Sequence, residues 1–283
     1  MVLNREDDAS RHRLLKAENA DIGDIPPIMD PERRESCRLD FRNFLVTYKP
    51  DRYVLEFSPY HEELIGAVET AILSSLRKLI VFPRGSGKTS ISRDAVEWGT
   101  LYGHIRFPML FGAELKKTKQ HMQSILTDLL YNEMLLEDFP EVCYPINQSE
   151  GISNRARFQR YRGEHTRLRI GAEHLVFPEI DLSRERGNGG SIIAVGTITG
   201  SASRGPLINN LRPDFALIDD PQTRSSAKSP MQCRERMDAI NGDIAGMAGP
   251  TKQLSMLMTA TVITHGDAID QMLDKEEYPH WDG

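Results

Sequence analysis

Residues 79–90 read Leu-Ile-Val-Phe-Pro-Arg-Gly-Ser-Gly-Lys-Thr-Ser, and this stretch decides the fold. Four apolar residues lead into a glycine-rich turn, and a segment with helical character follows, which is the order of a phosphate-binding loop. Gly85 and Gly87 let the backbone curl so that its N–H groups point at phosphate oxygens, and the helix adds its positive N-terminal end. We expect Lys88 to reach the β- and γ-phosphates of ATP and the Thr89 hydroxyl to bind Mg²⁺.

The loop departs from the common G-x-x-x-x-G-K-[ST] pattern, because Phe82 stands at the first glycine position and Arg84 lies inside the loop. This departure indicates a specialised branch of the ATPases. The alternative is a bare turn, which the acidic motif further along the chain disfavours. The predicted nucleotide-binding residues of the loop are Pro83, Arg84, Gly85, Ser86, Gly87, Lys88, Thr89 and Ser90.

The second motif is an apolar strand that ends in two carboxylates, Arg-Pro-Asp-Phe-Ala-Leu-Ile-Asp-Asp-Pro at residues 212–221. We expect Asp219 to hold Mg²⁺ through water and Asp220 to orient or deprotonate the attacking water. Many ATPases carry glutamate at the second position, so Asp220 would have to lie closer to the nucleophile. A simple turn before Pro221 is the alternative interpretation.

Two further signals adjoin these motifs. The strand-like run from Gln253 ends in Thr259, Ala260 and Thr261, whose hydroxyls suit the sensing of a γ-phosphate and its coupling to movement. Upstream, Ser58 and Pro59 open a helix, and His61 in its first turn is a candidate contact to the nucleotide base. A histidine on the helix surface is the alternative for His61.

Composition limits the classes of function. The chain has 283 residues, a net charge of −6 and three scattered cysteines, which describes a soluble protein with reduced thiols and no membrane span. The charge argues against a protein that coats nucleic acid throughout. A local DNA contact and a merely solvated face both remain open for one arginine-rich stretch, which contains Arg155, Arg157, Arg160, Arg162, Arg167 and Arg169.

Two domains are expected: an N-terminal arm at residues 1–45 and an ATPase domain at residues 46–283. Helices are expected at 59–76, at 90–102 and after 112, with strands at 105–111, 168–170, 175–177 and 191–195. The region 140–167 is expected to be rich in loops. The fold class is α/β, a P-loop NTPase with an additional strand, in which a mostly parallel central sheet is flanked by helices.

These motifs, in this order, resemble the large terminase subunit of tailed bacteriophages, over roughly residues 40–282. An arginine just inside the phosphate-binding loop and an Asp-Asp-Pro ending are both features of that family. The stretch that ends in Asp-Phe-Pro, residues 129–140, is also similar. The motifs that carry the resemblance lie at residues 83–89, 203–205, 216–221 and 259–261.

The resemblance implies an ATPase motor that drives double-stranded viral DNA into a procapsid, with ATP and Mg²⁺ as cofactors. It implies that Arg84 contacts the γ-phosphate within the same subunit, and it makes Arg204 a candidate arginine finger, with Arg212 and Arg224 as weaker candidates. The implied partners are the portal protein, the small terminase subunit and further copies in a ring. The implied location is the host cell cytoplasm.

The nuclease domain that large terminases carry is expected to be absent from this chain, because only 22 residues follow Thr261. Three alternatives differ from a packaging motor. A helicase-like ATPase would separate nucleic-acid strands, and a nucleotide-binding assembly module would bind ATP with negligible turnover. A small-molecule kinase is disfavoured, since the spacing from Lys88 to Asp219 leaves room for an extra strand.

Overall fold

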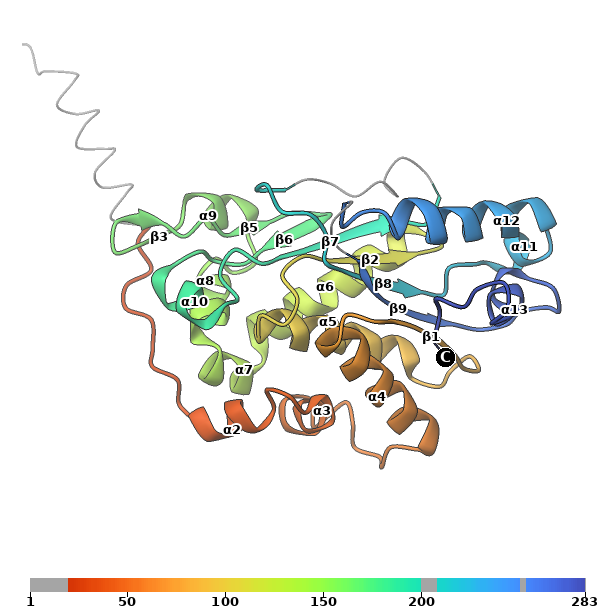
Figure 1. The fold of residues 1–283 in the computed structure, drawn as a ribbon. Coiled ribbons are helices and arrows are strands. Elements are labelled where there is room, and N and C mark those ends of the chain that lie inside the picture. Colours follow the sequence, from red (N-terminus) through yellow and green to blue (C-terminus); the bar gives the residue numbers. More distant parts are fainter. Residues whose placement is uncertain (1–19, 200–207, 250–252, 283) are drawn as a thin grey trace, which may run out of the picture.

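A mostly parallel sheet forms the centre of the molecule (Figure 1). The structure is a computed structural model that describes residues 20–199, 208–249 and 253–282. Within these ranges the sheet has seven strands in the order β1–β9–β8–β2–β7–β6–β5. The first five run parallel, and β6 is antiparallel to both of its neighbours. The strands are β1 (Arg77–Val81), β2 (Pro108–Gly112), β5 (Arg169–Ile170), β6 (His174–Val176), β7 (Ile192–Thr197), β8 (Phe215–Asp219) and β9 (Ser255–Ala260).

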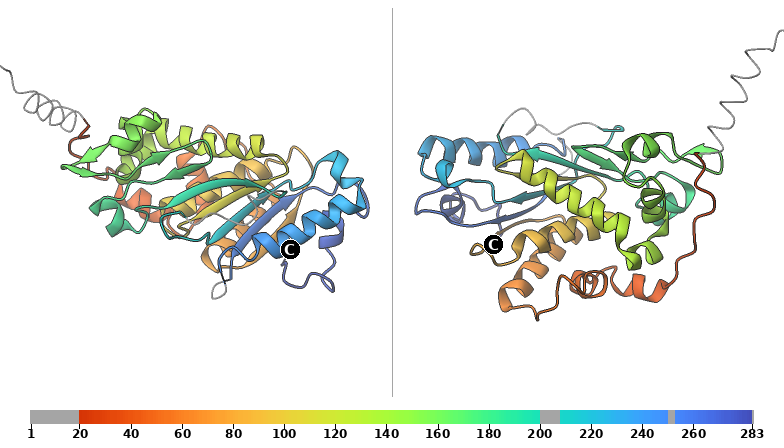
Figure 2. Two further views of the ribbon diagram at one scale, coloured as in Figure 1. Left: turned by 90° about the horizontal axis from the view of Figure 1, so that it is seen from above. Right: turned by 180° about the vertical axis from the view of Figure 1, so that it is seen from behind.

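Helices cover both faces of this sheet (Figure 2). On one face lie α4 (Pro59–Leu73), α5 (Lys88–Leu101) and α6 (Leu115–Tyr131), and on the other lie α12 (Pro230–Asp238), the π-helical turn Ala239–Ile244 and α13 (Ala268–Met272). Alternate strand residues serve the two layers, so that Leu217 faces one apolar cluster and Ile218 the other. The predicted α/β class, with a mostly parallel sheet flanked by helices, is confirmed.

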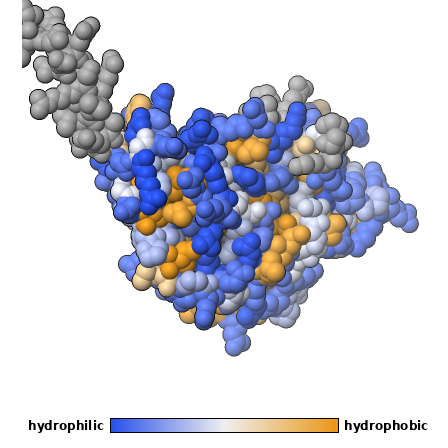
Figure 3. Space-filling model, turned by 60° about the vertical axis from the view of Figure 1, so that its left-hand side comes forward, coloured by the Kyte–Doolittle hydropathy of each residue, from blue (hydrophilic) through white to orange (hydrophobic). Residues whose placement is uncertain are grey.

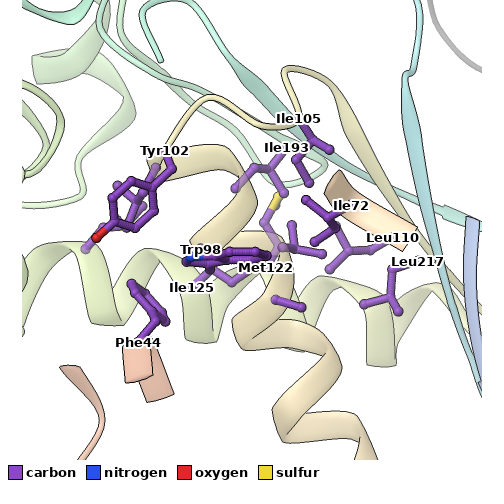
Figure 4. Packing of buried hydrophobic residues seen from close by; sticks show 14 of the residues in the cluster. Phe44, Ile72, Trp98, Tyr102, Ile105, Leu110, Met122, Ile125, Ile193 and Leu217 are labelled. Carbon is purple, nitrogen blue, oxygen red and sulfur yellow. The ribbon is translucent and has the colours of Figure 1, made fainter. Parts of the chain in front are cut away.

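The larger apolar cluster is centred on Trp98 of α5 (Figure 4). Its indole N–H donates to the carbonyl of Cys37 at 2.9 Å, and the ring centroids of Phe41 and Trp98 lie 5.2 Å apart. The helix α3 (Phe41–Tyr48) and Cys37, which directly follows the helix α2 (Pro31–Ser36), therefore belong to the core. The helix α3 runs across residue 45, where the sequence places the end of an arm, and residues 1–19 lie outside the described part.

The prediction that residues 140–167 are mainly loop is wrong. This region holds α8 (Pro140–Gln148), α9 (Ser153–Phe158) and a hairpin of β3 (Arg160–Tyr161) and β4 (Glu164–His165). Pro145 inside α8 makes the local sequence unfavourable for a helix. The helix forms nevertheless, because Val142, Cys143 and Ile146 on it are fully buried. The remaining described helices are α7 (Glu133–Asp138), α10 (Asp181–Arg186) and α11 (Arg224–Ala227), none of which the sequence predicts.

Candidate functional site

The carboxyl ends of three adjacent parallel strands bring the three motifs together. Strand β9 lies between β1 and β8, with Val81 opposite Ala260 and Asp219 opposite Thr259. Because parallel strands end at the same edge of a sheet, the predicted phosphate-binding loop, the paired aspartates and the threonines meet there. Strand β9 thus lies between the strand that precedes the loop and the strand that ends in Asp219.

The loop after β1 has the backbone shape that its glycines predict. Gly85 and Gly87 have φ values of 81° and 77°, in the left-handed region that favours glycine. Gly87 caps α5, whose first residue is Lys88, so the N-terminal end of this 14-residue helix faces the loop. The loop and Asp220 line a hollow of about 230 Å³, and the buried Ser86 hydroxyl on the loop has no hydrogen-bond partner within the described chain. Both features fit a bound phosphate.

Asp219 is a buried carboxylate held by two hydroxyl groups. Thr89 Oγ1 donates to Asp219 Oδ2 at 2.9 Å, and Thr259 Oγ1 donates to Asp219 Oδ1 at 2.9 Å. Burial raises the pKa of Asp219, and the neighbouring charge of Asp220 adds to that rise. A buried carboxylate beside a second carboxylate and a hydroxyl is a donor set that suits a hard divalent cation such as Mg²⁺. Thr89 and Asp219 therefore fit the metal role predicted for them.

Lys88 joins the loop to the other two motifs. Its Nζ donates to Thr261 Oγ1 at 3.0 Å and lies 3.4 Å from Asp220 Oδ1. Thr261 Oγ1 in turn donates to the Phe82 carbonyl at 2.9 Å. Asp220 has a φ of 43°, unusual for a residue with a side chain, and its N–H donates to the Thr259 carbonyl at 2.9 Å. Such strained backbone is common at functional sites.

His61 is a link between α4 and the phosphate-binding loop. Its Nδ1 accepts from the Ser58 N–H at 3.2 Å, so the neutral ring carries its proton on Nε2, which donates to the Ser86 carbonyl at 2.7 Å. The ring is therefore not a freely solvated surface group. The contact to a base stays a prediction, and it would have to use the ring carbons because both nitrogens are engaged.

A second hollow, of about 350 Å³, adjoins the loop on the side of His61. Its walls are residues 52–57, the loop residues Gly85 to Gly87, and Ser90 and Ile91 at the start of α5. Tyr53 and Phe57 lie on this wall with ring centroids 5.5 Å apart. The hollow is thus mostly apolar at the place where a nucleoside attached to the loop-bound phosphates would lie.

The arginine candidates differ in placement. Arg84 is exposed and lines the hollow beside the loop, whereas Arg204 lies outside the described residues. Arg212 precedes β8, so its backbone lies near the amino end of that strand, whereas Asp219 lies at the carboxyl end. The structure therefore does not bring Arg212 to the site. Arg224 is an exposed residue of α11.

Two features near the site were not predicted from the sequence. His121 of α6 lies with its Nε2 3.9 Å from Asp219 Oδ2, and burial lowers its pKa. Beneath α5, Lys49, Arg52 and Arg93 pair with three clustered carboxylates. Because cations of the protein already occupy that cluster, we assign it no metal. No local motif marks either feature, although the histidine does lie on the helix that follows β2. The three carboxylates are Asp94, Glu97 and Asp128.

Comparison with protein-family models and curated proteins identified no relative of this chain. Among the described helices, none combines the length and the apolar character needed to cross a membrane.

Proposed function

We propose that this chain is an ATP-hydrolysing motor that translocates double-stranded DNA, corresponding to the ATPase domain of a phage large terminase subunit. The observation that carries the proposal is the shared partner of two motifs: the hydroxyls of Thr89 and Thr259 both donate to the buried Asp219. The order β1–β9–β8–β2 supports a P-loop fold of the additional-strand type. The DNA substrate rests on the resemblance of the ordered motifs to terminases.

The proposed chemistry is in-line attack of water on the γ-phosphate of ATP. Mg²⁺, held by Thr89 and through water by Asp219, would supply positive charge at the phosphates. Asp220 accepts the proton of the attacking water as the water oxygen bonds to the γ-phosphorus, and the bond from that phosphorus to the bridging oxygen breaks with ADP as the leaving group. Lys88 exchanges its 3.4 Å contact with Asp220 for the phosphate oxygens, and Arg84 adds a second positive charge. The freed Asp220 carboxylate is then available as the base.

The contact from Lys88 to Thr261 suggests how the phosphate could be sensed. Thr261 Oγ1 is bonded both to the Lys88 ammonium and to the Phe82 carbonyl at the start of the loop. Movement of Lys88 onto a phosphate would break the first of these bonds. The residues 259–261 would thereby report the state of the nucleotide to β9.

The cellular context is part of the proposal. A packaging motor would work as a ring on the portal of a procapsid, with the small terminase subunit, in the cytoplasm of the host cell. An arginine from a neighbouring subunit, for which Arg204 is the candidate, would complete the site in the ring.

Hydrolysis measured across protein concentration and with added DNA tests this function. We expect the rate per subunit to rise with concentration and on addition of blunt duplex DNA, without strand separation. Unwinding of a forked duplex would favour a helicase-like ATPase instead. Tight ATP binding that changes the oligomeric state without turnover would favour an assembly module.

A further inference from the structure

A basic hollow lies at the edge strand β5, on the far side of the sheet from β1. It has a volume of about 750 Å³ and lies between α9, β4 and the β5–β6 hairpin. Its lining contains three arginines, two histidines and no carboxylate among the described residues. We call it the basic groove, with the lining residues Arg157, Phe158, His165, Arg167, Arg169 and His174.

Two arginines of the basic groove keep an uncompensated charge. Neither Arg157 nor Arg169 lies within ion-pair distance of a carboxylate in the described part of the chain, and both are exposed. Arg167 differs, because it lies 2.8 Å from Glu179. The Arg157 guanidinium lies 5.5 Å from the centre of the Phe158 ring, which is 58% exposed. On a protein of net charge −6, this local positive charge is not a consequence of composition.

Two neighbouring arginines of the same stretch have acidic partners, whereas Arg160 donates to the Gly163 carbonyl and contacts His165. Arg155 pairs with Glu150, and Arg162 lies 3.5 Å from Asp24. The arginine-rich stretch is therefore not a uniformly solvated face, because its two exposed arginines without a carboxylate partner in the described chain, Arg157 and Arg169, both line one hollow. Figure 3 turns the left-hand side of Figure 1 forward and shows strongly hydrophilic surface around small apolar patches there.

We propose that the basic groove binds the phosphodiester backbone of duplex DNA. Exposed guanidinium groups suit phosphate oxygens, which they bind by paired hydrogen bonds, and no carboxylate in the lining repels a polyanion. Backbone contact is favoured over the stacking of single-stranded bases, because Phe158 is the one Phe, Tyr or Trp among the described lining residues and Arg157 lies against it. The choice of duplex DNA rests on the proposed function, whereas the phosphate chemistry does not.

The basic groove is also connected, through helix α6, to the proposed nucleotide site at the carboxyl ends of the parallel strands. In the β5–β6 turn, Glu173 lies 2.8 Å from Lys119 of α6, and the Val195 N–H donates to the Glu173 carbonyl at 3.0 Å. The same helix carries His121, next to Asp219. DNA held in the groove would thus contact a part of the protein that packs directly on the helix beside the ATP site.

Binding of a fluorescein-labelled 30-base-pair duplex to the full chain, without nucleotide, tests the proposal by fluorescence anisotropy over a range of salt concentrations. Each lost phosphate contact should reduce the slope of log affinity against log salt by about 0.9. For the Arg157→Ala/Arg169→Ala variant we therefore expect a slope lower by about 1.8 and an affinity roughly 10- to 60-fold weaker at 0.1 M salt. The control Lys228→Ala/Arg234→Ala also removes two exposed positive charges, from the α11–α12 region, and should bind as the wild type does.

Three results would overturn the proposal: an unchanged slope in the groove variant, an equal loss in the control variant, or a preference for single-stranded DNA that Phe158→Ala abolishes. Lys88→Ala should bind the duplex with wild-type affinity, because it changes only the nucleotide site. If the wild type does not hydrolyse ATP but the groove variant loses DNA affinity as expected, the proposed motor function is refuted and the groove assignment stands.

Discussion

Lys49 neutralises buried carboxylates beneath α5, and its replacement by methionine should strongly destabilise the fold. Its Nζ lies 2.8 Å and 2.9 Å from the two Glu97 oxygens and 2.7 Å from Asp128 Oδ2. The Lys49 side chain is 2% exposed and that of Glu97 is fully buried. Removing one partner of such a buried pair costs about 3–5 kcal/mol, since the remaining carboxylates must either stay charged without this cation or take up a proton. With a urea slope of about 3 kcal/mol/M, the unfolding midpoint should fall by roughly 1–1.7 M.

Urea unfolding followed by circular dichroism at pH 8 measures this effect. Lys116→Met removes an exposed lysine of α6 that makes no ion pair in the described structure, and it should leave the midpoint unchanged. Lys49→Met/Glu97→Gln should recover part of the loss, because the neutral amide needs no cation. A Lys49→Met midpoint within about 0.3 M of the wild-type value, at the usual urea slope, would refute the reasoning.

The destabilisation of Lys49→Met should also depend on pH. Burial raises the pKa of Glu97 from 4.5 to about 8, even though Lys49 lowers it. Without Lys49 the pKa of the folded state rises further above that of the unfolded chain. Stability that depends on protonated Glu97 is fully present below about pH 4.5 and is lost as the pH rises through the pKa of the folded state. The difference between variant and wild type should therefore be largest at pH 8 and above, and shrink toward pH 5.

Three further substitutions test individual contacts of the site. Asp220→Asn should reduce ATP hydrolysis by about 100-fold or more while ATP binding persists, and lost binding would make Asp220 a metal ligand or a structural residue instead. Thr259→Val removes a hydrogen bond to the buried Asp219 and should weaken Mg²⁺-dependent nucleotide binding by about 10- to 100-fold; Thr259→Ser should restore it, and an equal defect in both variants would contradict this role. His61→Leu frees the Ser86 carbonyl and should weaken binding of a fluorescent ATP analogue by about 5- to 10-fold, whereas unchanged affinity would show that the loop holds its shape without the histidine.

The sequence predicts the parts of the fold in which a local pattern and the tertiary structure agree. The apolar runs before the phosphate-binding loop and before Asp219 form β1 and β8, and Ser58 caps α4 as its position before Pro59 indicates. The site residues meet because parallel strands share an edge, which the motif order implies. The contact of Thr259 with Asp219 could be anticipated from that order, but not its geometry.

The features that the sequence did not predict depend on long-range contacts. Helix α8 forms despite Pro145, and α2 is held by pairs such as Arg34 with Glu141, at 2.8 Å and 107 residues apart. The neighbours of Lys49 lie 48 and 79 residues away along the chain, so no periodicity reveals them. Local propensity carries no information about such pairs, and they were found only in the structure.

Steady-state ATP hydrolysis by the wild type, measured beside Lys88→Ala, is the most direct test of the proposal that this site hydrolyses ATP. Lys116→Ala is the matched control, because it also removes a lysine but from an exposed site on α6. We predict Mg²⁺-dependent hydrolysis that Lys116→Ala retains and Lys88→Ala loses, with a fall of at least about 100-fold. Hydrolysis by Lys88→Ala at the wild-type rate would contradict the assignment of the site.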